Sequence, residues 1–149
     1  MSAGHGLQSG TRGLVIGLFV SMCAAAVAGE ANSLMDISAD GQLLACANRD
    51  NGTVTLVDLR SRQKRREVDV GETPEGVTFV GHTHRVAVAV YGEDRVVLMD
   101  ADRGVRTGAV EVFDEPYGIV SDSAGGHLFV TLDYPGRVVD IEVDDLRVG

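Results

Sequence analysis

The sequence contains no tryptophan, only three prolines and few positive charges, whereas it contains nineteen glycines. Many glycines beside few prolines favour a chain with many tight turns over one built from long helices. Thirteen basic residues face twenty-two acidic ones, which gives a net charge of −9. That balance argues against a nucleic-acid partner, because phosphates demand a basic surface. The 44% hydrophobic content is enough for a packed core.

Residues 1–28 have the order of charge and hydrophobicity that is typical of a cleavable secretion signal. Arg12 is the only charged residue before position 29, residues 13–26 are apolar, and Ala26 and Ala28 provide the small residues that signal peptidase recognises. We therefore expect cleavage before Gly29 and a mature chain, residues 29–149, in the periplasm or outside the cell. A retained membrane anchor fits less well, because the apolar stretch is shorter than the roughly 20 residues of a span.

The two cysteines have different predicted fates. Cys23 lies within the signal, and Met22 before it is too bulky for the small residue expected ahead of a lipidated cysteine. After cleavage Cys46 is the only thiol, so an intramolecular disulfide is excluded even in an oxidising compartment. Cys46 stands in the apolar run 43–47, which predicts a small buried side chain rather than a nucleophile.

A repeat of 42 residues organises the mature chain. Pro74 and Pro116 lie 42 positions apart in matching contexts, and the segments 43–59, 85–101 and 127–143 align at that offset without a gap. Three gap-free copies are a strong sign of tandem structural units. The copies cover approximately residues 29–70, 71–112 and 113–149.

Each copy contains the pattern of four short strands. In the second copy they are expected at 76–80, 85–91, 95–100 and 108–112, joined by turns rich in glycine and acidic residues. An antiparallel four-stranded unit of about 40 residues in tandem is the blade of a β-propeller. A parallel solenoid fits less well, because its turns are shorter. The prediction is an all-β chain with no helix beyond the signal.

The number of blades predicts an incomplete ring. The third copy stops before the strand equivalent to 108–112, which leaves about 2.75 blades. Closed propellers need roughly 4 to 8 blades. We therefore expect either a fragment of a longer propeller or a chain that self-associates.

Four motifs resemble the YVTN-type β-propeller repeat: the Pro-x-Gly entry at Pro74, the turn 38–41 (SADG), and the strands 44–48 (LACAN) and 54–58 (VTLVD). The resemblance covers residues 29–149 and concerns the repeat type. It implies kinship with exported and surface-layer proteins, lactonase-like propellers and propeller subunits of amine dehydrogenases. Tyr-Val-Thr-Asn itself is absent in strict form, and the second copy has 80–84 (VGHTH) in place of Ser-Pro-Asp-Gly.

Candidate catalytic and metal-binding residues are few. His82 and His84 have a spacing that can place two imidazoles on one metal, but no third ligand recurs nearby, so solvated histidines are favoured. Equivalent carboxylates recur at strand ends, where they fit turn hydrogen bonding better than acid–base catalysis; these are Asp58, Asp100 and Glu142. The sequence predicts neither catalytic residues nor a cofactor.

A ligand is expected on the face where the turn before the first strand and the turn between the second and third strands meet. Ser33, Glu75 and Tyr117 occupy one repeat position nearest the axis. The candidates farther out are Arg49, Glu93, Asp94 and Tyr134. Tyr117 is the best anchor, because it combines an apolar ring with a polar tip.

One basic cluster stands out in this acidic chain, namely Arg60, Arg62, Lys64, Arg65 and Arg66. It is expected in the hairpin between the third and fourth strands, as a solvated turn or as a dock for an acidic partner. The function predicted overall is an exported binding or protein-interaction module without catalysis of its own, with a protein or small-molecule ligand. The alternative is a fragment or subunit of a propeller enzyme, lactonase-like or amine-dehydrogenase-like.

Overall fold

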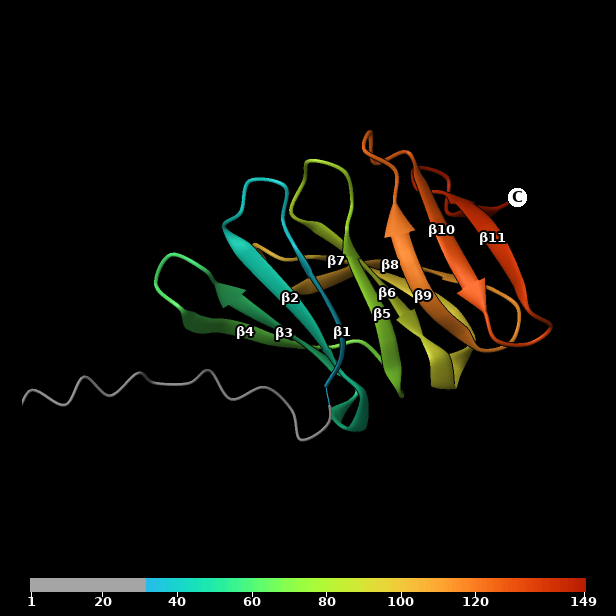
Figure 1. Ribbon diagram of the computed structural model, residues 1–149, viewed down its shortest axis with the longest axis horizontal. Coiled ribbons are helices and arrows are strands. Elements are labelled where there is room, and N and C mark those ends of the chain that lie inside the picture. Colours follow the sequence, from blue (N-terminus) through green and yellow to red (C-terminus); the bar gives the residue numbers. More distant parts are fainter. Residues whose placement is uncertain (1–31) are drawn as a thin grey trace, which may run out of the picture.

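The computed structural model describes residues 32–149, which form three four-stranded antiparallel sheets (Figure 1). The predicted signal, its cleavage site and Cys23 lie outside the described residues. Blade 1 contains β1 (Asn32–Ile37), β2 (Leu43–Asn48), β3 (Thr53–Asp58) and β4 (Gln63–Asp69). Blade 2 contains β5 (Pro74–Phe79), β6 (Arg85–Val90), β7 (Arg95–Asp100) and β8 (Val105–Glu111). Blade 3 contains β9 (Pro116–Ser121), β10 (His127–Leu132), β11 (Arg137–Glu142) and β12 (Arg147–Val148).

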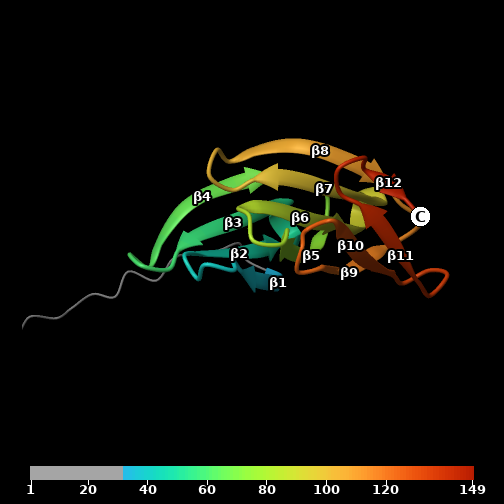
Figure 2. The ribbon, with the colours of Figure 1, turned by 90° about the horizontal axis from the view of Figure 1, so that it is seen from above.

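The sheets lie side by side in an open arc, with blades 1 and 3 at its two ends (Figures 1 and 2). Seen from above, the first strands β1, β5 and β9 gather on one side and the fourth strands β4, β8 and β12 on the opposite side (Figure 2). Each chain connection therefore leads from the outer strand of one blade to the inner strand of the next. The predicted all-β fold of repeated four-stranded blades is confirmed, and the arc matches part of a propeller ring.

Several predicted boundaries were wrong by a few residues. β5 begins at Pro74, because Thr73 takes a positive φ of 53° and completes the turn before it. β6 ends at Val90, since Tyr91–Glu93 forms the short 3-10 helix η2; its counterpart η1 (Arg49–Asn51) follows β2. The expectation of no helix therefore misses these two single turns.

Two further corrections concern the outer strands. β8 begins at Val105 rather than at position 108, because the Gly104 amide closes the preceding turn onto the Asp100 carbonyl at 2.8 Å. The third copy does not stop before its outer strand. Arg147 and Val148 pair with Glu142 and Ile141, so blade 3 has a fourth strand of two residues.

The turns repeat their backbone conformation together with the sequence. Gly52, Asp94 and Gly136 follow the second strands and have φ values of 68°, 51° and 71°. Only glycine adopts this left-handed region without strain, and aspartate tolerates it better than most residues. A residue in this conformation turns the chain back into the third strand, which explains why the dipeptides at 51–52 and 135–136 predict hairpins.

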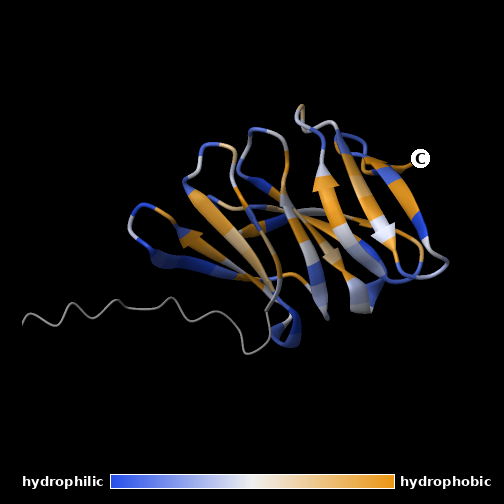
Figure 3. Cartoon of the chain, in the orientation of Figure 1, coloured by the Kyte–Doolittle hydropathy of each residue, from blue (hydrophilic) through white to orange (hydrophobic). Residues whose placement is uncertain are grey.

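The core lies between the blades. One buried cluster joins blades 1 and 2 and includes Leu56, Val88 and Met99, and a second joins blades 2 and 3 through Leu98 and Leu128. Hydrophobic residues run along the strands, and the connections are mostly hydrophilic (Figure 3). β6 is buried on both faces apart from its first residue, as its continuous apolar sequence predicts.

Cys46 is 6% exposed within β2, so its predicted burial is confirmed. Burial raises the pKa of its thiol. No helix among residues 32–149 is long and apolar enough to cross a membrane.

Candidate binding face

The turns before the inner strands and the turns after the second strands lie on one side of the arc, as predicted. The Tyr91 amide donates to the Thr73 carbonyl at 3.1 Å, and the Asp133 amide donates to the Glu115 carbonyl at 2.9 Å. These bonds occupy the same repeat position in blades 2 and 3. We call the side formed by residues 49–52, 71–75, 91–94, 114–117 and 133–136, together with Ser33, the axial face.

Glu75 is the most buried polar group of the axial face, with 2% of the residue exposed. Its carboxylate accepts a hydrogen bond from the Ser33 hydroxyl, and its Oε1 lies 3.1 Å from Nε of Arg49. Ser33 and Arg49 belong to blade 1, whereas Glu75 opens blade 2. The structure thus brings three predicted site residues together, and it gives the Glu75 carboxylate partners from the neighbouring blade. About half of the Arg49 side chain is exposed and can contact a ligand.

Tyr117 occupies the third equivalent position, at the start of β9. It is 40% exposed. The backbone around it packs closely against blade 2, because a Cβ built on Gly76 would lie 2.3 Å from the Tyr117 carbonyl oxygen. The backbone of Tyr117 is therefore packed against blade 2, while its side chain remains accessible on the axial face.

Tyr91 is a residue of this face that the sequence reasoning missed. Partial burial, followed by the interaction of its phenol with the Glu115 carboxylate and by the nearby charge of Asp133, raises the pKa of Tyr91. The repeat could have predicted that Tyr91 lies on this face. Arg49, Tyr91 and Asp133 stand 42 residues apart and occupy one structural position.

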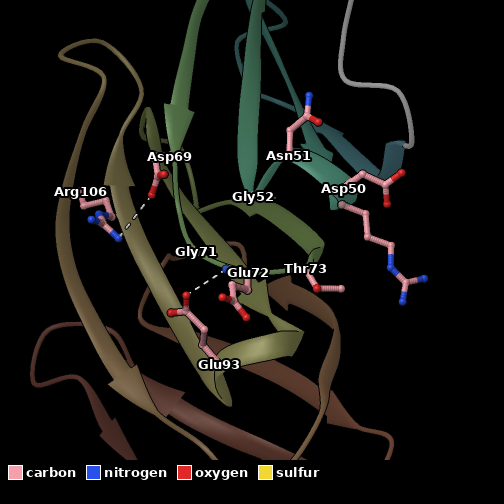
Figure 4. Close-up of a pocket in the computed structure, with 10 residues that line it drawn as sticks. Asp50, Asn51, Gly52, Asp69, Gly71, Glu72, Thr73, Glu93 and Arg106 are labelled. Atoms are coloured by element: carbon pink, nitrogen blue, oxygen red, sulfur yellow. Dashed lines mark hydrogen bonds and ion pairs between the residues drawn. The ribbon is translucent and has the colours of Figure 1, made fainter.

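A cleft of about 960 Å³ opens between blades 1 and 2 on the axial face (Figure 4). The Arg49 and Arg106 side chains line it together with carboxylates. One of these, Glu93, accepts a hydrogen bond from the Glu72 amide at 2.9 Å and pairs with Arg95. Arg106 lies 3.8 Å from Asp69. The cleft therefore contains both charge signs, most of them already paired within the protein.

A second cleft, of about 370 Å³, lies between blades 2 and 3 at the same repeat position. Five of its positions stand 42 residues after positions of the first cleft. Its lining residues are Tyr91, Gly92, Asp94, Asp114, Glu115 and Tyr134. None of these is basic. Asp94 accepts a hydrogen bond from the Glu115 amide at 3.1 Å, and Tyr134 is 66% exposed. The predicted candidates Asp94 and Tyr134 thus share one cleft, and Glu93 and Arg49 share the other.

The two histidines of the β5–β6 turn lie at the opposite end of the strands from the axial face. His84 bridges two carboxylates, with Nδ1 2.9 Å from Asp102 and Nε2 3.1 Å from Asp40. His82 is exposed beside it. Within the described part of the chain no group of three or more potential ligands is arranged to hold a metal ion.

The equivalent carboxylates at strand ends take part in turns. Asp58 accepts from the Ser61 amide at 2.7 Å, and Asp100 accepts from the amides of Asp102 and Arg103 at 2.9 and 3.0 Å. For these two residues the predicted turn hydrogen bonding is confirmed.

The basic cluster is only partly in a turn, contrary to the prediction. β4 begins at Gln63, so Lys64, Arg65 and Arg66 stand within that strand. Lys64 pairs with Glu67 of its own strand, and Arg65 lies 3.1 Å from Asp102 of blade 2. The strand starts early because Arg62 takes a φ of 57° and closes the turn. Arg60 and Arg62 remain exposed in that turn.

No family model and no curated protein matches the sequence. The structure, however, is similar to solved structures. It matches Kuenenia stuttgartiensis hydrazine synthase with a TM-score of 0.76 and 22% identity, over 88% of this chain and 38% of that chain. It also matches the β-propeller domain of Myceliophteria thermophila Cps50 (Swd1) with a TM-score of 0.67 and 16% identity, over 83% and 38% of the two chains. The fold is that of a β-propeller.

The WD40 repeats of RRP9 are a third propeller neighbour, with a TM-score of 0.68 and 16% identity over 77% of this chain and 34% of that chain. This propeller chain spans less than two fifths of the length of each of the three. Its neighbours include both WD40 proteins and an enzyme. At these identities the likeness concerns the fold, and function has to be argued from the site.

Proposed function

We propose that this chain is an exported propeller module of the YVTN-repeat type that binds a positively charged ligand through its axial face. The observation that carries the proposal is the recurrence of a cleft at one repeat position between each pair of neighbouring blades. The strands around the clefts are constant in pattern, whereas the lining changes from Arg49 to Tyr91 and from Thr73 to Glu115. A rigid scaffold with variable turns is the arrangement expected of a recognition surface.

The second cleft has the chemistry that a cationic group needs. Tyr91 and Tyr134 offer aromatic rings, whose faces attract ammonium and guanidinium groups. Asp94, Asp114 and Glu115 add carboxylates, and none of the residues that line this cleft is basic. A lysine or arginine side chain of a partner protein, or a small primary amine, fits this combination. Asp114 is exposed and accessible to such a ligand.

Binding without turnover is the reading favoured by the position of the reactive groups. The single described thiol, Cys46, is buried in β2, and burial raises its pKa, so it is a poor nucleophile. Glu75 is enclosed by Ser33 and Arg49. The accessible side chains of the axial face, such as Tyr117 and Tyr134, are suited to contact and hydrogen bonding.

The proposal is tested by fluorescence anisotropy with a labelled oligolysine peptide, and with a labelled oligoglutamate peptide of equal length. We expect saturable binding of the basic peptide alone, and at least about tenfold weaker binding for the Asp114→Asn/Tyr134→Ala variant, since each contact contributes roughly 1 kcal/mol. Asp145→Asn is the matched control, because it removes the same charge from an exposed turn at the other end of the strands. An equal loss in the control variant, or equal binding of both peptides, would contradict the proposal.

The alternative hypothesis, that the chain is an enzyme, is tested on the same protein preparations. Lactones and primary amines are incubated with the purified chain and with Tyr134→Ala and Tyr117→Ala. We expect no turnover above that of buffer. Turnover that either substitution abolishes in a folded protein would establish an enzyme and overturn the binding module.

A further inference from the structure

The two ends of the arc expose sheet faces that the middle blade keeps covered. On blade 3 the exposed face contains Val120, Phe129 and Val138, which are 59%, 41% and 63% exposed. Val120 is directly opposite Phe129 in the β9–β10 ladder, and Val138 lies on the same face opposite Thr131. Figure 3 shows hydrophobic stretches on these terminal strands at one end of the arc. Three large apolar side chains therefore form one patch.

The repeat identifies what this patch is. Phe129 and Val138 stand 42 residues after Ala87 and Val96, which are fully buried in the cluster that joins blades 2 and 3. The exposed face of blade 3 is thus the same surface by which blade 2 receives its neighbour. The exposed face of blade 3 is therefore complementary to the opposite face of another blade of this repeat.

Blade 1 exposes that opposite face. Met35 and Ile37 of β1 are 61% and 54% exposed. They stand 42 residues before Val77 and Phe79, which are 4% exposed and belong to the cluster that joins blades 1 and 2. The two ends of the arc therefore carry the two complementary halves of a blade–blade interface that already occurs twice within the chain.

Charge favours contact between unlike ends over contact between like ends. The described part of blade 1, residues 32–70, contains six basic and six acidic residues, and five of the basic ones stand between positions 60 and 66. Blade 3, residues 113–149, contains two basic and eight acidic residues. Two blade 3 faces would repel each other, whereas the described part of blade 1 has no net charge and does not repel an acidic blade 3.

We propose that the open face of blade 3 binds blade 1 of a second copy of this chain, and that two copies close head to tail into a six-bladed ring. Two identical junctions then satisfy both pairs of open faces under two-fold symmetry. The number of blades selects the dimer, because propellers close with roughly 4 to 8 blades and a third copy would exceed that range. In this ring β9 of one copy lies beside β1 of the other, as β5 lies beside β9 within the chain.

The first test is the oligomeric state, measured by sedimentation equilibrium over a range of concentrations. We expect the full chain to be dimeric, and Met35→Lys and Phe129→Asp each to shift it to a monomer. Mixing the two variants restores a dimer, because one of the two junctions in the mixed pair has both native faces. Val105→Lys is the control, since it charges a similarly exposed apolar residue on β8, away from both patches. Circular dichroism checks that each variant remains folded.

Cross-linking gives a second measurement that does not depend on weakening the interface. Within the chain, Oδ2 of Asp36 accepts from the Phe79 amide at 2.8 Å. The same positions at the proposed junction are Val120 of one copy and Ile37 of the other. The double variant Ile37→Cys/Val120→Cys is therefore expected to form interchain disulfides on mild oxidation, whereas neither single variant does so.

Other outcomes would overturn the proposal. A full chain that stays monomeric at all concentrations would do so, as would a trimer. A dimer lost in Phe129→Asp but intact in Met35→Lys would show contact between two blade 3 faces, and the reverse pattern would show contact between two blade 1 faces. Disulfide dimers of a single variant would contradict the head-to-tail arrangement.

Discussion

The hydroxyl of Ser33 donates a hydrogen bond to the carboxylate of Glu75, the residue at the same position of the next repeat. Two equivalent positions of neighbouring blades are therefore in direct contact near the axis. Arg49 lies 3.1 Å from the same carboxylate and belongs to the same blade as Ser33. Glu75 thus fastens blade 2 to blade 1 through two polar contacts in a place where only 2% of the residue is exposed.

The role of Glu75 predicts a loss of stability when it is truncated. Glu75→Ala leaves the Ser33 hydroxyl and the Arg49 guanidinium without this partner, so we expect the free energy of unfolding to fall by about 1–3 kcal/mol. Urea denaturation measures this loss of free energy. Glu75→Gln keeps a hydrogen-bond acceptor for Ser33 and should lose less. The exposed Asp145→Ala serves as control, and a similar loss in that variant would contradict the assigned role.

Gly76 of β5 lies close to the backbone of the inner strand β9. A Cβ there would lie 2.3 Å from the Tyr117 carbonyl oxygen, which is too short for a nonbonded contact between carbon and oxygen. We expect Gly76→Ala to lower the free energy of unfolding by about 1–3 kcal/mol, because the two backbones must separate. Gly126→Ala is matched to it, since a Cβ at Gly126 meets nothing within 4 Å. Thermal unfolding of both variants decides the point, and equal midpoints would refute the close approach.

His84 makes the stability of the blade 1–blade 2 contact depend on pH. Partial burial opposes protonation, but hydrogen bonds with Asp102 and Asp40 outweigh it and raise the pKa of His84. Because the pKa is raised on folding, protonated His84 stabilises the folded state. This stabilisation is fully present below the pKa of the unfolded state, about 6.5, and is lost as pH rises through the pKa of the folded state.

The carboxylates limit this contribution on the acid side. The Ser38 hydroxyl and the Gln42 amide lower the pKa of Asp40, and His84 lowers that of Asp102. Their contribution is therefore lost as pH falls through these lowered values. We expect His84→Gln to lower the unfolding midpoint in urea more at pH 6 than at pH 8.5. His82 is exposed, so we expect His82→Gln to change the unfolding midpoint little, and by the same amount at both pH values. If His82→Gln showed the same pH dependence as His84→Gln, the pH dependence would not come from His84.

The predicted signal peptide has its own test. Expression of the full chain with an export system should yield a mature protein that begins at Gly29 in the periplasmic or secreted fraction. Intact-mass measurement identifies the first residue of the mature chain directly. An Ala28→Asp change places a charged residue at the cleavage position and should block processing, and a native protein that retains residues 1–28 would contradict the prediction.

The positions of the strands could be predicted because they depend on short stretches of chain. The 42-residue offset placed β7 correctly and the other strands of blade 2 within three residues, since alternation, apolar runs and turn residues act over only a few positions. The errors occur where a turn closes earlier than its residues suggest, as at Gly104 and Thr73. The short outer strand β12 was missed because two residues carry no periodic pattern.

The face that carries the candidate site also followed from the repeat, because the order of strands in a blade decides which turns share a side. The partners of each side chain did not follow. Glu75 appeared in the sequence as an accessible carboxylate, and only the approach of blade 1 shows it enclosed by Ser33 and Arg49. Tyr91 was predicted as the end of a strand, and its interaction with Glu115 depends on how blade 3 packs against blade 2.

The sequence by itself determined the blade, since each one is built from neighbouring strands whose hydrogen bonds and turns are local. The tertiary structure alone decided which groups are enclosed between blades and which faces stay open. That choice depends on the rotation of one sheet against the next and on groups in different repeats, such as the Asp36 carboxylate and the Phe79 amide, which lie 43 residues apart and bond across a blade junction. Phe129 instead lies on the open face of blade 3 and is 41% exposed. No local pattern encodes those distances, because they arise only when complete sheets pack against each other.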